Sequence, residues 1–256
     1  MEQEDFQFLY ELEKNFWWFA GMREITRTLF DSVNLRAQQP EDGLILDAGC
    51  GTGDMLAWLS QYTENKNAVG IDLSKIALDF CARNGERQIA QASTTDLPFP
   101  EETFSLLTSF DVLVQVVGEK ADEQAIGEMY RVLCPGGIVF VRVAAYEWMR
   151  SGHDKALNTQ HRYTLGELVQ KLKNAGFEPL RSTYANCFLL PAAIGRRLLL
   201  KKIGLADKGS DVKPLESEWL NRQLTKFLRA EAGLLRNGRT KLPFGLSAIC
   251  IARKPE

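Results

Sequence analysis

Hydrophobic residues form short runs through the middle of the chain, and stretches of helical periodicity separate most of these runs. The apolar runs cover residues 44–48, 68–72, 88–91, 104–109 and 137–144. The helical stretches cover residues 54–62, 74–84 and 119–133. Short strands that alternate with helices are typical of a parallel sheet with right-handed crossovers. The pattern therefore predicts an α/β fold.

The N-terminal part departs from this alternation. Residues 4–36 predict two helices, with the aromatic run Phe16-Trp17-Trp18-Phe19 between them and the second helix opening at Gly21. After the strand at 104–109 and its helix, the run Cys134-Pro135-Gly136-Gly137 predicts a helix end and a turn into the fifth strand.

The pattern is also looser after residue 150. Thr164 is expected to cap a helix that reaches Ala175, with Glu167 completing a capping box. Strands are expected at 178–187 and 246–253, and residues 189–238 between them have mainly helical character.

The combined pattern predicts a Rossmann-like, doubly wound sheet of seven strands, six of them parallel, with a hairpin-like final strand. We expect one domain over residues 1–256, because this length fits one α/β unit with additions better than two independent units. Its expected parts are an N-terminal helical cap (1–40), a core (41–188 and 239–256) and a helical insertion before the last strand (189–238).

The most informative stretch is Leu44–Gly53, which reads LILDAGCGTG. A buried strand runs into a turn with three glycines, and a helix follows. Glycines let the backbone approach a ligand and adopt positive φ, and the free N–H groups of a helix start favour an anionic group. The spacing Gly49, Gly51, Gly53 differs from the dinucleotide fingerprint, and Asp54 is poorly suited to lie beside a pyrophosphate.

Three acidic residues at strand ends extend this signal. Asp72 ends the second strand about 20 residues after the glycines, where a carboxylate can accept both ribose hydroxyls. Asp96 lies in the loop after the third strand, where it can accept an adenine amine while Leu97 packs on the ring. Asp47 ends the first strand, near a ligand's ammonium group. A ligand with ribose, adenine and a zwitterionic tail but no phosphate fits all three positions.

These motifs resemble the series found in class I S-adenosylmethionine (SAM)-dependent methyltransferases of the small-molecule "type 11" kind. The resemblance covers roughly residues 44–144 and includes Asp96-Leu97-Pro98-Phe99 and Arg131–Gly137. It implies that SAM is the cofactor. The implied cofactor-binding residues are Arg23, Asp47, Gly49, Cys50, Gly51, Gly53, Asp72, Leu73, Asp96, Leu97 and Phe110. Cys50 itself is expected to be inert, chosen for its small size and not for reactivity.

One departure from the family bears on catalysis. Relatives often carry a Glu-His pair after Asp-Val-Leu, whereas this chain has Val114-Gln115. The only histidines, His153 and His161, lie in the segment after the fifth strand, where ligands of open α/β sheets bind. We therefore expect His153 or His161 to act as a catalytic base toward the acceptor, although a polar connecting loop is an equal alternative.

The net charge of −2 conceals an asymmetry. Residues 1–149 hold 11 Lys and Arg against 24 Asp and Glu, and residues 150–256 hold 20 against 9. The expected helix 215–236 has leucines and Phe227 on one stripe and Arg222, Lys226 and Arg229 on the opposite one, with Glu231 in the apolar stripe. We expect a cationic or backbone partner for Glu231. The basic part either meets an anionic substrate or surface or is solvated.

Several classes of protein fit poorly. No apolar run reaches the roughly 20 residues that cross a bilayer, and the start of the chain is acidic, unlike a secretory signal. The five scattered cysteines predict reduced thiols and a cytoplasmic location, without a metal site.

The predicted function is SAM-dependent methyl transfer to a small-molecule acceptor, with an anionic or amphiphilic acceptor favoured by the basic part. The alternatives are a non-catalytic SAM-binding module and a nicotinamide oxidoreductase, which Asp54 disfavours. A nucleic-acid partner is not expected because the motif Asn/Asp-Pro-Pro-Tyr is absent. Peripheral contact with a membrane and the oligomeric state are left open.

Overall fold

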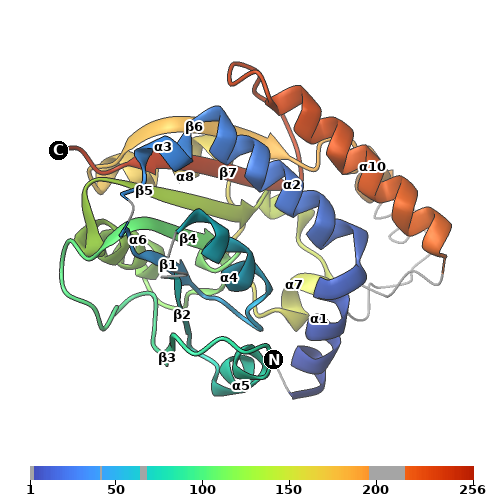
Figure 1. The fold of residues 1–256 in the computed structure, drawn as a ribbon. Coiled ribbons are helices and arrows are strands. Elements are labelled where there is room, and N and C mark those ends of the chain that lie inside the picture. The colour runs from blue at the N-terminus through green and yellow to red at the C-terminus, as the bar shows by residue number, and fades with distance from the viewer. Residues whose placement is uncertain (1–2, 41, 64–67, 196–216) are drawn as a thin grey trace.

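The computed structural model describes residues 3–40, 42–63, 68–195 and 217–256 of the chain (Figure 1). Its centre is a seven-stranded sheet of order β3-β2-β1-β4-β5-β7-β6. The strands are β1 (Ile45–Ala48), β2 (Ala68–Asp72), β3 (Ile89–Gln91), β4 (Phe104–Phe110), β5 (Leu133–Ala144), β6 (Glu178–Ala185) and β7 (Ser247–Arg253). Only β7 runs antiparallel to its neighbours, β5 and β6. The predicted mostly parallel, Rossmann-like sheet is thus confirmed.

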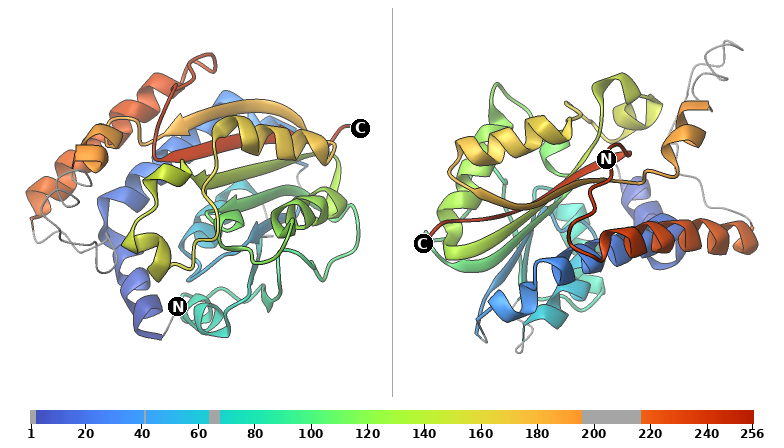
Figure 2. Two further views of the ribbon diagram at one scale, coloured as in Figure 1. Left: turned by 180° about the vertical axis from the view of Figure 1, so that it is seen from behind. Right: turned by 90° about the horizontal axis from the view of Figure 1, so that it is seen from above.

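Helices cover both faces of this sheet (Figure 2). They are α1 (Gln3–Asn15), α2 (Trp17–Ser32), α3 (Leu35–Gln38), α4 (Asp54–Leu59), α5 (Lys75–Arg83), α6 (Ala121–Val132), α7 (Gly152–Ala156), α8 (Leu165–Asn174) and α10 (Glu218–Leu235). In the right view of Figure 2, α2 and α10 lie on one side of the sheet and α8 on the other. The strands therefore bury apolar residues on both faces, as parallel sheets require.

The core lies on both faces of the sheet, and α2 contributes a large part of it on one face. Met22, Ile25, Leu29 and Phe30 of this helix are almost fully buried. The Phe30 ring meets Phe140 of β5 edge-on at 5.3 Å and stacks on Trp58 of α4 at 6.0 Å. Because aromatic rings bury large areas and pair in specific geometry, this cluster fixes α2 across the sheet. The start of α2 is thereby held beside the carboxyl ends of the strands.

Two predicted boundaries were wrong. The second helix was expected to open at Gly21, but α2 begins at Trp17, so the aromatic run forms its first turn. The turn expected at 134–137 is absorbed into β5, which begins at Leu133 directly after α6. Gly136 there has a φ of 77° and donates its N–H to the Lys254 carbonyl. Pairing with the end of the chain therefore carries the strand through the glycines.

The C-terminal part confirms two local predictions. Thr164 and Glu167 form the expected capping box at the start of α8. Glu231, fully buried in α10, accepts the backbone N–H groups of Asn186, Cys187 and Phe188 at 2.6, 2.8 and 3.3 Å. A buried carboxylate needs such donors, and here the loop after β6 supplies them.

The predicted stripes of α10 were only partly right. Leu228, Glu231, Ala232 and Leu235 are buried, but Phe227 and Leu234, expected on the same stripe, are 55% and 49% exposed. The apolar stripe is wider than the surface of α10 that packs against α2, so the residues at the edge of the stripe stay exposed. Residues 196–216, which belong to the helical insertion expected at 189–238, lie outside the described residues.

None of the helices in the described ranges has both the length and the apolar character to cross a membrane.

The contact between α2 and α10 gives a test of the fold. A Cβ added at Gly21 would lie 2.3 Å from Leu228 Cδ1 and 2.5 Å from Leu228 Cβ, so the two helices would have to separate. We expect Gly21→Ala to destabilise the protein by about 1–3 kcal/mol, as overpacking does. The melting temperature by calorimetry measures this effect.

Gly233→Ala in α10 is the matched control, since a Cβ there meets nothing within 4 Å. It should leave the melting temperature unchanged or raise it, because alanine favours a helix over glycine. Equal melting temperatures for Gly21→Ala and the wild type would show that α10 does not pack against α2 as described.

Candidate functional site

The turn between β1 and α4 folds back over the neighbouring strand β2. The N–H groups of Gly49 and Cys50 both donate to the Ile71 carbonyl at 2.8 Å. Gly49 and Gly53 have φ values of 93° and 94°, which disfavour any side chain. A Cβ at Gly49 would also lie 2.2 Å from Val112, in the segment after β4. This glycine therefore permits the close approach of the loops that follow β1 and β4.

The middle glycine of the turn faces open space. Gly51 has a φ of 55°, and a Cβ built on it meets nothing within 4 Å. Its N–H donates to Asp72 Oδ2 at 3.0 Å, and the N–H of Ser74 donates to Asp72 Oδ1 at 2.8 Å. The Asp72 carboxylate thus links the glycine turn to the start of α5. The open side of Gly51 lies next to this carboxylate.

Asp47 is a buried acid with one unsatisfied oxygen. Its side chain is 1% exposed, and Oδ1 accepts the Thr108 hydroxyl at 2.8 Å. Oδ2 is buried and has no hydrogen-bond partner. The pKa of Asp47 is raised to about 7, mainly by burial and also by the nearby Asp72, while the hydrogen bond from Thr108 opposes the rise. A cationic group placed beside Oδ2 would offset this penalty.

Glu13 of α1 is a second buried acid at the turn, and sequence reasoning missed it. Its carboxylate accepts a hydrogen bond from the hydroxyl of Thr52, which is fully buried between Gly51 and Gly53. Burial raises the pKa of Glu13 to about 7. No motif marks Glu13, because only the docking of α1 on the turn brings it there. The N-terminal helix therefore covers part of the glycine loop.

Two arginines lie on either side of this region. Arg23 of α2, predicted to contact a cofactor, pairs with Asp54 at 3.2 Å. Arg142 of β5, which the sequence did not single out, pairs with Asp111 at 2.7 Å. The Arg142 guanidinium also lies 4.9 Å from the Trp18 ring and 5.1 Å from the Phe110 ring. Arg142 therefore fixes the predicted site residue Phe110 against the first turn of α2.

The remaining predicted cofactor residues differ in accessibility. Leu73, directly after Asp72, is 71% exposed, and Asp96 is exposed. Leu97 is only 3% exposed and belongs to the core, and its N–H donates to Glu128 at 2.8 Å. Cys50 is buried, and its sulfur would lie 2.8 Å from a Cβ at Gly70. The small inert role expected for Cys50 fits this packing, while Leu97 already has its partners in the core.

The segment after β4 joins the glycine turn to the histidine-bearing loop. Val112 packs on Gly49, while the Val114 carbonyl accepts the N–H groups of Gln160 and His161 at 2.7 and 3.3 Å. Gln115, where relatives often have histidine, is exposed. The loop 146–163 is tightly bonded: buried Arg162 donates to Asp154 at 2.6 Å and to the Ala145 carbonyl at 3.0 Å. The loop is therefore a structured part of the carboxyl edge of the sheet.

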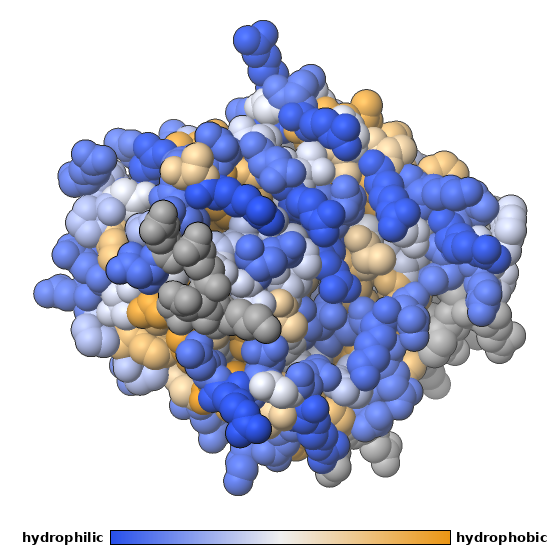
Figure 3. Space-filling view, viewed as in Figure 1, coloured by the Kyte–Doolittle hydropathy of each residue, from blue (hydrophilic) through white to orange (hydrophobic). Residues whose placement is uncertain are grey.

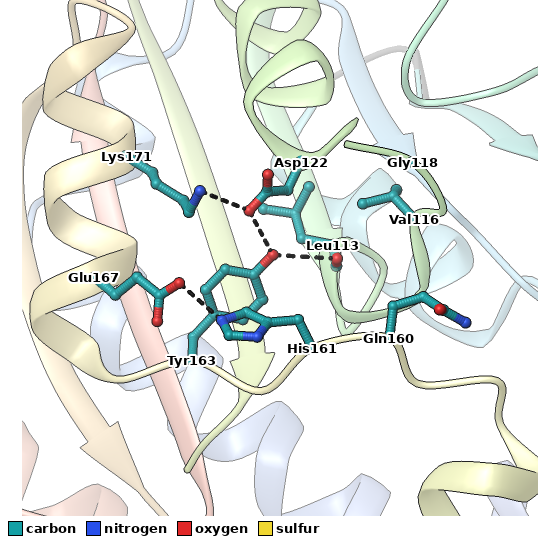
Figure 4. A pocket seen from close by; sticks show the side chains of 9 residues that line it. All are labelled: Leu113, Val116, Gly118, Asp122, Gln160, His161, Tyr163, Glu167 and Lys171. Carbon is teal, nitrogen blue, oxygen red and sulfur yellow. Dashed lines mark hydrogen bonds and ion pairs between the residues drawn. The ribbon is translucent and has the colours of Figure 1, made fainter. Parts of the chain in front are cut away.

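His161 lines a cavity of about 350 Å³ between this loop, the segment after β4 and α8 (Figure 4). His161 Nε2 lies 2.8 Å from Glu167 Oε1. The Tyr163 hydroxyl donates to Asp122 at 2.8 Å, and Asp122 pairs with Lys171 at 3.0 Å. His153 belongs to α7, but its side chain lies outside the described residues. Among the described residues no group of acids, cysteines and histidines could hold a metal ion.

The geometry around the glycine turn fits a zwitterionic nucleoside ligand. Three features lie around the carboxyl ends of β1 and β2: the open face of Gly51, the unsatisfied oxygen of Asp47 and the exposed side chain of Leu73. Ligands of open α/β sheets bind at this edge. Acids whose pKa values are raised by burial, such as Asp47 and Glu13, are found more often at functional sites than elsewhere.

Comparisons with known proteins agree with this geometry. A family model described as a methyltransferase domain, of type 11, matches residues 46–141. Sterol 24-C-methyltransferase of Eremothecium gossypii is 26% identical over 86% of this chain and 69% of its own length. The tRNA (carboxymethyluridine(34)-5-O)-methyltransferase of Arabidopsis thaliana is 31% identical over 47% of this chain, which spans only 28% of that protein.

A solved structure shares the fold over nearly the whole chain. It is a putative methyltransferase in complex with the Haloferax volcanii Trm112 methyltransferase activator, with a TM-score of 0.57 and 17% identity over 96% of this chain and 93% of that one. The family model over residues 46–141, these relatives and the shared fold support a class I methyltransferase, the kind of enzyme that uses S-adenosylmethionine as methyl donor.

Proposed function

We propose that this protein transfers a methyl group from SAM to a small acceptor that is anionic or amphiphilic. The observation that carries the proposal is the glycine turn beside Asp47, whose buried carboxylate has an oxygen without a partner. The acceptor class is supported by the excess of basic residues after position 149 and by the likeness to a sterol methyltransferase.

The residues at the carboxyl edge of the sheet suit the parts of SAM. Asp47 would accept the ammonium group, the glycines 49, 51 and 53 would line the methionine part, and Asp72 would hold the ribose. Leu73 and Asp96 remain accessible for the adenine, whereas the buried Leu97 would support them from the core. The cofactor supplies a methyl group already activated by its sulfonium.

The chain itself would orient the reactants and exclude water. The first turn of α2, with Trp18 against Arg142, and the end of α1, with Glu13 on Thr52, cover the turn from the N-terminal side. Alignment and desolvation account for most of the acceleration in a transfer of this kind. Phe110 and Arg23 then belong to the wall of the site.

On the acceptor side we propose His161 or His153 as the base. His161 is supported by its place in the cavity of Figure 4 and by the Glu167 carboxylate at 2.8 Å, which orients the ring. A base held by a third group is the usual arrangement for proton removal from a nucleophile.

The first prediction concerns Asp72. Asp72→Ala should weaken binding of S-adenosylhomocysteine by about 1.5–3 kcal/mol, the loss expected for hydrogen bonds to a charged group. Calorimetric titration measures the change, and Asp79→Ala on the exposed side of α5 is the matched control. If the wild type does not bind S-adenosylhomocysteine, the proposed function is ruled out. If Asp72→Ala binds it as tightly as Asp79→Ala does, the role of Asp72 is ruled out.

The second prediction concerns the protonation of Asp47. With a pKa of about 7, Asp47 is partly protonated at neutral pH, and a ligand ammonium would favour its charged form. Binding of S-adenosylhomocysteine at pH 7 should therefore release protons, and affinity should rise from pH 6 to pH 8. Titrations in buffers of different ionisation enthalpy measure the release.

The variant Asp47→Asn distinguishes the proton release of Asp47 from that of Glu13, the other acid with a pKa of about 7. The variant should bind weakly and release fewer protons, whereas Glu13→Gln should retain the contribution of Asp47. Because the folded pKa of Asp47 exceeds its unfolded value, the acid costs stability progressively as pH rises from about 4 past 7. Asp47→Asn should thus raise the melting temperature more at pH 8 than at pH 5; an equal effect at both would contradict the raised pKa.

The third prediction concerns the base. With an acceptor found by screening amphiphilic anions for transfer of a radiolabelled methyl group, His161→Ala should lower kcat about 10²-fold, the typical contribution of a general base. Cofactor affinity should hardly change. Gln160→Ala, in the same cavity, is the control. A fall in melting temperature with unchanged kcat would leave His161 a structural residue.

A further inference from the structure

Helix α10 is fixed to the rest of the protein along one face. Leu228, Ala232 and Leu235 are buried, and Leu228 lies against Gly21 of α2. Asn221 accepts the Trp17 N–H at 2.8 Å and donates its amide to the Asn15 carbonyl at 2.8 Å. These contacts fix the rotation of the helix and therefore decide which residues face away from the protein.

The outward side of α10 carries large apolar side chains. Trp219, Phe227 and Leu234 are 65%, 55% and 49% exposed, and Leu220 is 37% exposed. At 100° per residue, these four positions lie within an arc of about 100° on the helix surface. They form one stripe, whereas the other exposed large apolar residues of the described ranges are mostly scattered. In the space-filling view of Figure 3, hydrophobic side chains occur among hydrophilic ones in the region that α10 occupies in Figure 1.

The stripe continues onto the neighbouring loop. Phe188 is 47% exposed, and its N–H donates to Glu231 at 3.3 Å. Glu231 lies four residues after Phe227 and three before Leu234, so these two side chains flank it on the helix. Phe188 therefore lies beside the stripe, which widens the exposed apolar area.

A basic row runs along the other edge of the stripe. Arg222, Lys226 and Arg229 are all exposed and lie within about 100° of Trp219 on the side opposite to Phe227. The only acids of α10 are Glu218, at its first position, and the buried Glu231. We call these seven residues, Trp219, Leu220, Arg222, Lys226, Phe227, Arg229 and Leu234, the outer face of α10.

We propose that the outer face of α10 lies in the surface of a lipid bilayer that contains anionic headgroups. An apolar stripe with an adjoining row of cations is what a helix in the membrane interface requires: apolar side chains enter the acyl boundary and cations meet the headgroups. Exposed tryptophan and phenylalanine suit the same depth. This inference goes beyond the proposed function and does not depend on it.

Two other occupants fit the face less well. RNA would satisfy the cations, but Leu234 and Leu220 would remain in water, since nucleic-acid sites pair cations with stacking rings. A second copy across a two-fold axis would bring the basic row close to itself, and the outer face offers no acid to compensate. The mixture of aliphatic, aromatic and basic residues favours the lipid surface.

Docking in this way leaves the fold unchanged. The outer face points away from α2, so Gly21, Asn221 and Glu231 keep their contacts. The contacts of Asn221 tie α10 to the junction of α1 and α2, and Glu13 near the end of α1 bonds to Thr52 in the glycine turn. A docked helix would therefore hold this end of the protein close to amphiphilic molecules in the bilayer.

Co-sedimentation with vesicles tests the proposal. The full chain should bind vesicles of phosphatidylcholine with roughly 30% phosphatidylglycerol at least tenfold more tightly than pure phosphatidylcholine, and salt should weaken this binding. Two triple variants should each bind anionic vesicles at least tenfold more weakly than the wild type. One changes Trp219, Phe227 and Leu234 to Ser, and the other changes Arg222, Lys226 and Arg229 to Glu. Since all six side chains are exposed, their melting temperatures should match that of the wild type.

Matched controls come from elsewhere on the surface. Trp148→Ser removes a tryptophan that is 64% exposed, and reversal of Lys75, Arg83 and Arg87 to Glu changes the same charge at and just beyond α5. Both controls should bind vesicles like the wild type. Four results would each overturn the proposal. The controls could lose vesicle binding equally, or the wild type could show no preference for anionic vesicles. The wild type could also bind RNA more tightly than vesicles, or form a dimer that the triple serine variant dissociates.

Discussion

The buried carboxylate of Asp47 is the constraint on which the rest of the site depends. Taking an acid out of water without a cation is costly, and Thr108 satisfies only one of its oxygens. A sequence optimised for stability alone would not keep an acid at the end of a central strand. In the turn that follows Asp47, Gly49 and Gly53 allow close packing on Val112 and Cys81, and Gly51 leaves open space on its own outer side. The site that we propose for the methyl donor would thus be built at the expense of stability, as functional sites often are.

Most of the core could be predicted from the sequence because local and global signals agree there. The short β-rich runs, the glycine turn and the capping box at Thr164 each depend on residues close in the chain, and each was confirmed. The start of α2 was misjudged because contacts from distant parts of the chain stabilise its first turn. Asn221 accepts the Trp17 N–H, and Arg142 packs on the Trp18 ring. The role of Glu13 could not be inferred at all, since it depends on how α1 docks.

The two ends of the chain are coupled through side chains that no motif marks. Asn221 bonds to both residues next to Phe16, and Gly21 lets α10 approach α2. Residues about 200 positions apart therefore set the position of the cap over the glycine turn. Helical periodicity identified α10 as amphipathic, but it could not give the rotation of the helix, because the apolar arc is wider than the surface that α2 covers. That excess of apolar surface is why Phe227 and Leu234 were expected in the core.

The basic residues of the second half of the chain include two groups with different physical roles. Arg162 and Arg181 are buried and act within the protein: Arg162 pairs with Asp154, and Arg181 donates to the Leu235 and Thr240 carbonyls. Such cations hold the loop 146–163 and the end of α10 in place and are not available to a partner. The cations of α10 are exposed and adjoin apolar side chains instead of acids. A net charge counted along the sequence merges these groups, so the composition alone could not distinguish cations used inside the protein from the three that adjoin an apolar stripe on α10.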